Sequence, residues 1–134
     1  MDIVVRALIT LLGGVGLYAS LFMLSKTRRA ERGQLAEPSV VESPRARLYG
    51  GIPNAAVGAV YYPAVAVCSW FDLPYGWALA VLAAAGLAAA TSLALAYSLL
   101  FVTRRPCPYC WTAHAVNWSL LGLVAWLFKT NILK

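Results

Sequence analysis

Charged residues are scarce in this chain: they make up 12% of its 134 residues, and only five of them are acidic. A soluble domain carries about 25%. Because 61% of the residues are hydrophobic, the chain cannot cover a water-facing surface. The net charge of +6 comes from basic residues at the edges of apolar segments, so we expect no nucleic-acid partner. Three cysteines are also too few for a small fold held together by disulfides.

Long polar stretches are missing too, apart from one segment at 26–52. Each of the four remaining stretches is apolar enough and long enough to cross a membrane, for which a helix needs roughly 20 residues. The first is too long for a signal peptide and lacks a clear cleavage site, so we expect it to be retained. The third is mostly alanine and leucine, which indicates a scaffold helix without chemistry. The sequence therefore predicts an all-α fold, a single membrane domain over 1–134 built as a four-transmembrane-helix bundle, with helices at about 3–25, 53–71, 75–103 and 107–128 and a polar loop at 26–52.

Basic residues predict how this bundle is oriented. Eight of the eleven lie in the first and third connections, and three lie at the opposite end with the termini. Cytoplasmic loops are enriched in lysine and arginine, so we expect an integral, multi-pass cell-membrane protein with both termini outside. The eight are Lys26, Arg28, Arg29, Arg32, Arg45, Arg47, Arg104 and Arg105.

The start of the fourth stretch reads Cys107-Pro108-Tyr109-Cys110. Thiols at i and i+3 share one helix face, close enough for a disulfide, and Pro108 suits the first turn of a helix. The positive end of the helix favours a thiolate at the first position. We interpret the pair as redox-active; inert cysteines or a zinc site with His114 are the alternatives.

The third cysteine, Cys68, cannot join either arrangement. It lies far along the second helix, some 21 Å from the end where the other two are expected, at about 1.5 Å per residue. Disulfide-linked Cα atoms are under about 7 Å apart, and a structural zinc site needs four ligands. We therefore predict no metal site and treat Cys68 as an apolar filler.

Polar residues continue along the same face of the fourth helix, at His114 and Asn117. Such residues are costly in a bilayer, so they face the interior and tend to mark sites, although a lone asparagine often only bonds a neighbouring helix. The second helix starts at the same membrane face, which places Asn54 at a depth similar to that of Cys110, with Tyr61 or Tyr62 further in. Thiols, an amide, an imidazole and a phenol around one cavity suit an apolar ring with polar oxygens, such as a quinone.

Several of these residues recur in a longer ordered set, which runs Ser39-Val40-Val41-Glu42-Ser43, Tyr49-Gly50-Gly51-Ile52-Pro53-Asn54, Gly58, Tyr62, the CxxC motif and His114. In this set the chain resembles the vitamin K epoxide reductase family, whose members couple disulfide formation to quinone reduction in a four-helix membrane bundle. The resemblance covers about residues 37–117. It implies menaquinone, ubiquinone or a related quinone as the cofactor.

The resemblance also implies roles for individual residues. Cys110 would react with the quinone, and Cys107 would exchange disulfides with the thiol donor. Asn54 would hydrogen-bond a quinone oxygen, with His114 as a second polar contact and Tyr62 beside them, and Ser43 would anchor the loop over the site.

Two features depart from the family pattern. Relatives commonly carry a relay pair of cysteines in the first loop, but this chain has no cysteine before Cys68, and Glu37 stands at one relay position. The electron donor would then be a separate thioredoxin-like dithiol protein that reaches Cys107 directly. The charge distribution also places the CxxC at the cytoplasmic face, which is inverted relative to the usual orientation in the family.

We therefore predict a quinone-linked thiol:disulfide oxidoreductase that oxidises a partner dithiol. One alternative is the same chemistry run in the reducing direction. The other is a non-catalytic membrane subunit or assembly factor that has lost the relay cysteines.

Overall fold

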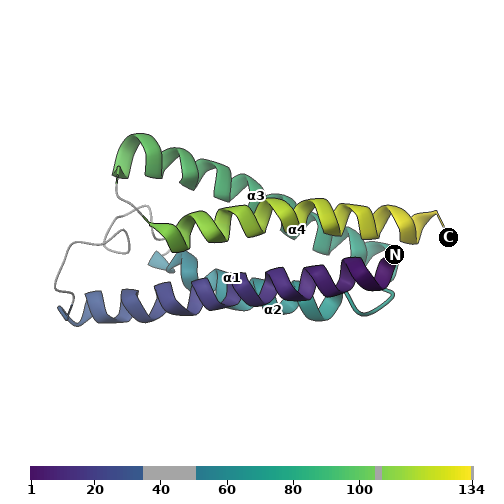
Figure 1. Ribbon diagram of the computed structural model, residues 1–134, viewed down its shortest axis with the longest axis horizontal. Helices are drawn as coiled ribbons and strands as arrows, with labels where there is room; N and C mark the ends of the chain where they lie inside the picture. The colour runs from purple at the N-terminus through teal and green to yellow at the C-terminus, as the bar shows by residue number, and fades with distance from the viewer. Residues whose placement is uncertain (35–50, 105–106, 134) are drawn as a thin grey trace.

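The computed structural model describes residues 1–34, 51–104 and 107–133, and within these ranges it has four long helices, a short π-helical segment and no strand. The helices run along one common axis, and both termini lie at the same end (Figure 1). The elements are α1 (Asp2–Glu31), α2 (Asn54–Cys68), α3 (Tyr75–Ser98), η4 (Leu99–Thr103) and α4 (Pro108–Ile132).

Prolines mark where three of these helices begin. Pro53 and Pro74 immediately precede α2 and α3, and Pro108 is the first residue of α4. A proline costs nothing at these positions, because its missing N–H would have no partner in the helix and its φ angle already suits a helix. These prolines fix where the helices begin, and the connection from α2 to α3 takes only residues 69–74.

The first helix is longer than the sequence predicted. It was expected to end near residue 25, where the polar segment begins, but α1 continues to Glu31. The added residues are mostly lysine, arginine, alanine and glutamate, which are good helix formers, and they include no proline or glycine. Gly33, with φ of 67°, follows the helix in the left-handed conformation that often ends helices. Polarity therefore marks where α1 leaves the apolar region, not where it ends.

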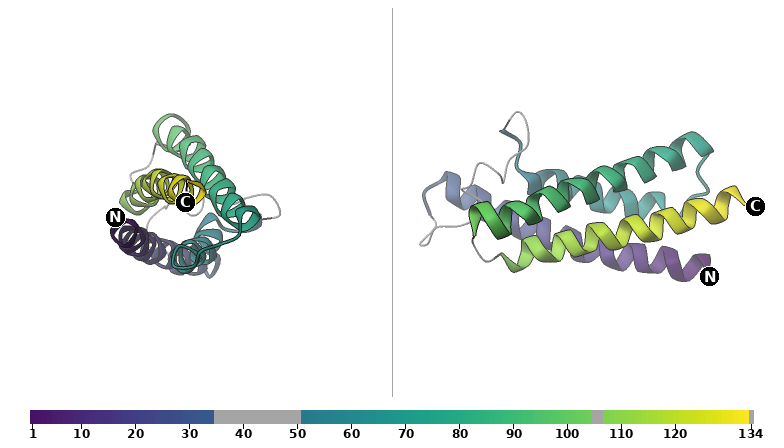
Figure 2. Two further views of the ribbon diagram at one scale, coloured as in Figure 1. Left: turned by 90° about the vertical axis from the view of Figure 1, so that its right-hand side faces the viewer. Right: turned by 90° about the horizontal axis from the view of Figure 1, so that it is seen from above.

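The four long helices are not packed symmetrically. α1 packs against α2 on one side and α4 on the other, and α4 in turn packs against α3. Figure 2 shows α4 lying between α1 and α3 when the bundle is viewed along its axis. Over the described residues α2 and α3 make almost no contact with each other. The bundle is therefore open between these two helices.

Small residues allow α1 and α2 to approach closely. A Cβ atom added at Gly16 would lie 2.5 Å from Cε1 of Tyr62, and one added at Gly58 would collide with the hydroxyl of Ser20. Close packing of this kind holds helices together in lipid, where the hydrophobic effect supplies no force between them. The two glycines thus fix the distance between α1 and α2.

The bundle is filled on the side of the termini. Large aliphatic side chains from α1, α2 and α4 meet there with Ala85 of α3, and Ile9 and Leu120 are fully buried. The remaining members of this core are Val5, Tyr62, Val65, Val116, Val124 and Leu127. Among the described residues, no such aliphatic cluster fills the half of the bundle nearer the CxxC motif.

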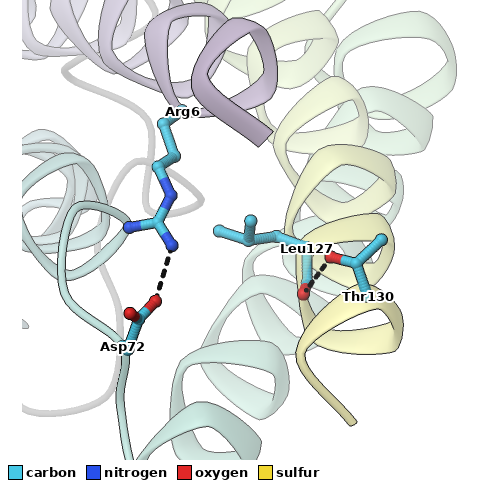
Figure 3. A network of polar contacts seen from close by, with 4 residues as sticks. All are labelled: Arg6, Asp72, Leu127 and Thr130. Carbon is cyan, nitrogen blue, oxygen red and sulfur yellow. Dashed lines mark hydrogen bonds and ion pairs between the residues drawn. The ribbon is translucent and has the colours of Figure 1, made fainter. Parts of the chain in front are cut away.

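A polar contact ties the α2–α3 connection to α1 at the terminal end. Arg6 donates to Oδ1 of Asp72 across 2.8 Å, as Figure 3 shows. The indole N–H of Trp70 donates to Thr10 across 2.9 Å, close to the same place. Arg6 lies within an apolar helix, and this pairing gives its charge a partner at the end of the bundle.

Length and composition bear on membrane insertion. Among the described helices, α1 and the continuous helix from Tyr75 to Thr103 are long and apolar enough to cross a membrane. α2 is apolar but has only 15 residues.

Candidate functional site

Cys107 and Cys110 form a disulfide at the start of α4, with their Cα atoms 5.2 Å apart. Cys107 is the N-cap residue, and its Sγ accepts a hydrogen bond from the backbone N–H of Cys110 at 3.2 Å. The same N–H groups and the positive helix end favour a thiolate at Cys107 when the pair is reduced. The motif therefore combines a closed disulfide with a local environment suited to opening it.

The two sulfurs have different surroundings. Cys107 is only 6% exposed, whereas Cys110 is half-buried and lines a cavity whose wall does not include Cys107. That cavity has a volume of about 390 Å³ and lies where α2 and α3 fail to meet. Its wall is mostly apolar and draws residues from all four long helices and η4. A ligand in this space would contact Cys110 and not Cys107.

Three further residues singled out from the sequence line the same cavity. Asn54 contributes from the first turn of α2, Tyr62 from two turns further along, and His114 from α4, one turn after Cys110. They meet because α2 and α4 both begin at the same end of the bundle. Ser43, expected to anchor the loop over the site, lies outside the described residues.

Tyr62 differs from its neighbour Tyr61 in what its hydroxyl does. The hydroxyl of Tyr62 donates to the carbonyl of Ala113 at 3.4 Å, and its side chain is 2% exposed against α1. Tyr61 also lines the cavity, and its hydroxyl is buried without a partner. Tyr62 thus has a clear packing role, while the hydrogen-bonding capacity of the Tyr61 hydroxyl is unused.

Other buried polar atoms around the cavity also lack partners. Both ring nitrogens of His114, Oδ1 of Asn117 and the hydroxyl of Ser98 make no hydrogen bond, although His114 is 5% exposed and Ser98 only 1%. Leaving a buried polar group unpaired costs about 1–3 kcal/mol. Several such groups gather around this one cavity.

Sequence reasoning missed the contribution of α3. Nδ2 of Asn117 donates to Oγ of Ser92 at 2.6 Å, which links α4 to a helix that was expected to be pure scaffold. Ser98 also faces this cavity from the last turn of α3. The available signal was hydroxyl side chains within an alanine- and leucine-rich segment.

Aromatic side chains brace the start of α4. Tyr109 stacks on Phe22 of α1 with ring centroids 4.0 Å apart, and Trp111 and Trp118 flank His114 at 5.9 and 6.2 Å. These contacts fix the turn of α4 that carries the disulfide and His114.

The alternative of a zinc site requires several metal-binding side chains close together. In the part of the chain that the structure describes, no three His, Cys, Asp or Glu side chains gather as a metal site would require. Cys68 is a free cysteine on α2.

Comparison with known proteins gives a family match that includes this region of the chain. The model of the Vitamin K epoxide reductase family matches residues 7–125. The chain belongs to this family. No curated protein matches the chain.

Family membership confirms the prediction of an all-α membrane helical bundle. It also implies a membrane oxidoreductase that links thiol–disulfide chemistry to a quinone. The match extends beyond the segment at 37–117 that carried the resemblance and includes most of α1 and α4.

Proposed function

We propose that this protein oxidises the dithiol of a separate thioredoxin-like protein and passes the electrons to a membrane quinone. The observation that carries the proposal is the position of Cys110, which closes a disulfide with Cys107 and also lines a mostly apolar cavity with unpartnered polar atoms. Only one sulfur of the pair is available to a ligand in the cavity. This asymmetry supports a division of labour between the two cysteines.

In the first half of the reaction, a partner thiolate attacks a sulfur of the Cys107–Cys110 disulfide. A mixed disulfide forms, the second partner thiol resolves it, and the products are a partner disulfide and a reduced CxxC pair. We assign the mixed disulfide to Cys107, whose thiolate the helix end favours and which does not line the cavity.

In the second half, the reduced pair loses two electrons and two protons and closes its disulfide again. The bound quinone supplies the oxidising power and leaves as the quinol. On the protein side, Cys110 faces the ring from α4, while Asn54 and His114 offer hydrogen bonds to its oxygens. The apolar wall excludes water and suits the ring carbons.

We further propose that all four long helices cross the membrane, α2 together with the apolar residues that flank it, with the CxxC motif at the cytoplasmic face and both termini outside. The support is the charge distribution: Arg28, Arg29 and Arg32 at the end of α1 and Arg104 after η4 all lie at the CxxC end. Cytoplasmic disulfides are common in hyperthermophiles, where such an orientation would be useful.

Cysteine substitution tests the proposed function directly. Cys107→Ser and Cys110→Ser should each abolish dithiol-dependent reduction of a soluble quinone by the purified protein. Cys68→Ala is the matched control and should retain near-normal turnover, because Cys68 is free and does not line the cavity. Full turnover by the Cys110 variant would refute the scheme.

Trapping tests the assigned roles. In the Cys110→Ser variant, the Cys107 thiolate should displace the leaving thiol from a thioredoxin-like protein whose single cysteine is activated as a mixed disulfide with a small thiol. Neither chain then holds a second thiol that can release the product, so the complex should accumulate. The complex should be visible on a non-reducing gel and disappear on reduction. The Cys107→Ser variant should accumulate far less, and equal trapping by both variants would contradict the assignment. An absence of quinone binding together with unaltered behaviour of both variants would favour a non-catalytic subunit.

A further inference from the structure

The hydrogen bond between Ser92 and Asn117 marks a polar level deep in the cavity. Both residues line it, one from α3 and one from α4, and the 2.6 Å contact places them at the same depth. From there the two antiparallel helices run towards the CxxC end. Six residues along α3 lead to Ser98, and seven residues back along α4 lead to Cys110.

Ser98 and Cys110 define a second polar level nearer the CxxC end. At about 1.5 Å per residue, six and seven residues correspond to roughly 9 and 10.5 Å, so these two lie at nearly the same level, about that far from Ser92 and Asn117. Both line the cavity, and the hydroxyl of Ser98 is buried and unpartnered. His114 lies between the two levels, buried and with both ring nitrogens free.

The spacing of the two levels suits one particular shape of ligand. A single six-membered ring with an oxygen at each end, plus a hydrogen bond at either oxygen, spans about this distance. A ring with adjacent oxygens, or with only one, reaches one level and leaves the other unpaired. The unpaired polar atoms would then keep their desolvation cost.

The hydrogen bond to Ser92 holds the Asn117 side chain in one orientation before a ligand binds. One N–H of the amide is held by the serine, which fixes the amide plane, while Oδ1 is buried without a partner. The amide nitrogen has a second N–H, and the amide also interacts with the hydroxyl of Tyr62. This N–H can donate to a carbonyl oxygen in place of the tyrosine hydroxyl, and Oδ1 can accept from a hydroxyl group, which are the two forms that the oxygen of a quinone takes.

We propose that Asn117 binds the far oxygen of a para-substituted quinone ring and that Ser92 is its positioning residue. The ring then lies lengthwise along the bundle axis, with one oxygen beside Cys110 and the other at Asn117. This inference rests on the proposed function and adds to it a selection for 1,4-quinones over one-oxygen rings of the same size.

Equilibrium binding tests the assignment without turnover. The full chain in detergent would be titrated with 1,4-naphthoquinone, and binding followed by quenching of tryptophan fluorescence, since Trp111 and Trp118 flank His114. A bicyclic ketone with a single oxygen, 1-tetralone, would be measured by competition with the quinone. The variants are Asn117→Leu and Ser92→Ala, with the exposed Ser119→Ala on α4 as the matched control.

Asn117→Leu should weaken naphthoquinone binding about tenfold, which corresponds to about 1.4 kcal/mol. Ser92→Ala should weaken it about threefold, because the amide remains but is no longer held. Binding of 1-tetralone should change less than twofold in both variants, and Ser119→Ala should match the unaltered chain throughout.

Unchanged naphthoquinone binding in Asn117→Leu, or an equal loss for both compounds, would overturn the assignment while leaving the proposed function intact, provided that the unaltered chain binds and reduces the quinone. An unaltered chain that binds no quinone would overturn both. Thermal melting shows whether Asn117→Leu has folded. If it has not, the affinities of Ser92→Ala for the two compounds decide the question. An unchanged ratio of these two affinities in Ser92→Ala would overturn the inference.

Discussion

The ring of Tyr62 occupies the space that a side chain at position 16 would need. Tyr62 is 2% exposed and lies where α2 faces α1, so it cannot move without opening the helix pair. Overpacking of a closely packed site costs typically about 1–3 kcal/mol. We therefore expect Gly16→Ala to lower the free energy of unfolding by this amount, measured as a drop in the thermal midpoint in detergent.

Gly14 provides the control for that substitution. It lies on the same helix, but a Cβ added there meets nothing within 4 Å. Gly14→Ala should be neutral or slightly stabilising, because alanine has the better helix propensity. Equal destabilisation by both variants would mean that helix propensity or lipid contact, and not the fit against Tyr62, governs this face of α1.

The Arg6–Asp72 ion pair should contribute little to the stability of the bundle. The ion pair is well formed, with its N and O atoms 2.8 Å apart; the Arg6 side chain is 12% exposed, but the Asp72 side chain is 87% exposed. Exposed ion pairs contribute about 0–1 kcal/mol. Asp72→Asn should therefore lower the thermal midpoint only slightly and leave quinone turnover unchanged, since the pair lies at the end of the bundle remote from the disulfide.

Salt provides the check on this interpretation. The small difference between Asp72→Asn and the unaltered chain should shrink further as ionic strength rises, because exposed charges are screened. A large, salt-independent loss of stability would show that Asp72 anchors the connection through more than its charge.

The sequence was most informative about residues near the starts of helices, because the direction of each helix determines which residues lie at the same depth. The proline-led starts of α2 and α4 at the same end of the bundle were enough to bring Asn54, His114 and Cys110 to one cavity. Apolar length gave the number and approximate position of the helices. These features depend on local chemistry and chain direction, which a sequence contains.

The contributions of α3 could not be obtained in this way. This helix is apolar on all sides, so its periodicity does not indicate which face turns inward, and Ser92 and Ser98 looked like incidental small residues. The gap between α2 and α3 was equally hidden, because the absence of a contact leaves no pattern in either segment. Both facts depend on how α3 leans on α4, which is a property of packing.

Tyr61 and Tyr62 form a matched pair for separating binding from stability. The hydroxyl of Tyr61 is buried without a partner, whereas that of Tyr62 bonds the carbonyl of Ala113. Tyr61→Phe removes an unsatisfied group, so the ligand-free protein should be as stable as before or up to about 1 kcal/mol more stable, while quinone binding weakens. Tyr62→Phe should instead lower stability by about 0.5–1.5 kcal/mol, the typical value of one hydrogen bond, with little effect on quinone affinity.

Thermal melting with and without naphthoquinone distinguishes these outcomes. The increase in midpoint on adding the quinone should be smaller in Tyr61→Phe than in the unaltered chain, and unchanged in Tyr62→Phe. A loss of ligand stabilisation in Tyr62→Phe alone would reverse the roles and make Tyr62 the binding residue, as the sequence comparison first implied.

The orientation of the bundle is open to a direct test with reporter fusions at the two termini. By sequence, eight of the eleven basic residues fall in or beside the two segments that join helices at the CxxC end, and α1 carries Lys26, Arg28 and Arg29 on its last turns, so positive charge should hold this end in the cytoplasm. A reporter active only outside the cytoplasm should function at both termini, and one active only in the cytoplasm at neither.

Replacing Arg28, Arg29 and Arg32 together with glutamine leaves five basic residues against three and should give a mixed population, which would tie the orientation to these charges. A terminus found in the cytoplasm in the unaltered chain would rule out the inverted arrangement and place the disulfide on the outer face, where its thiol partner would then have to be sought.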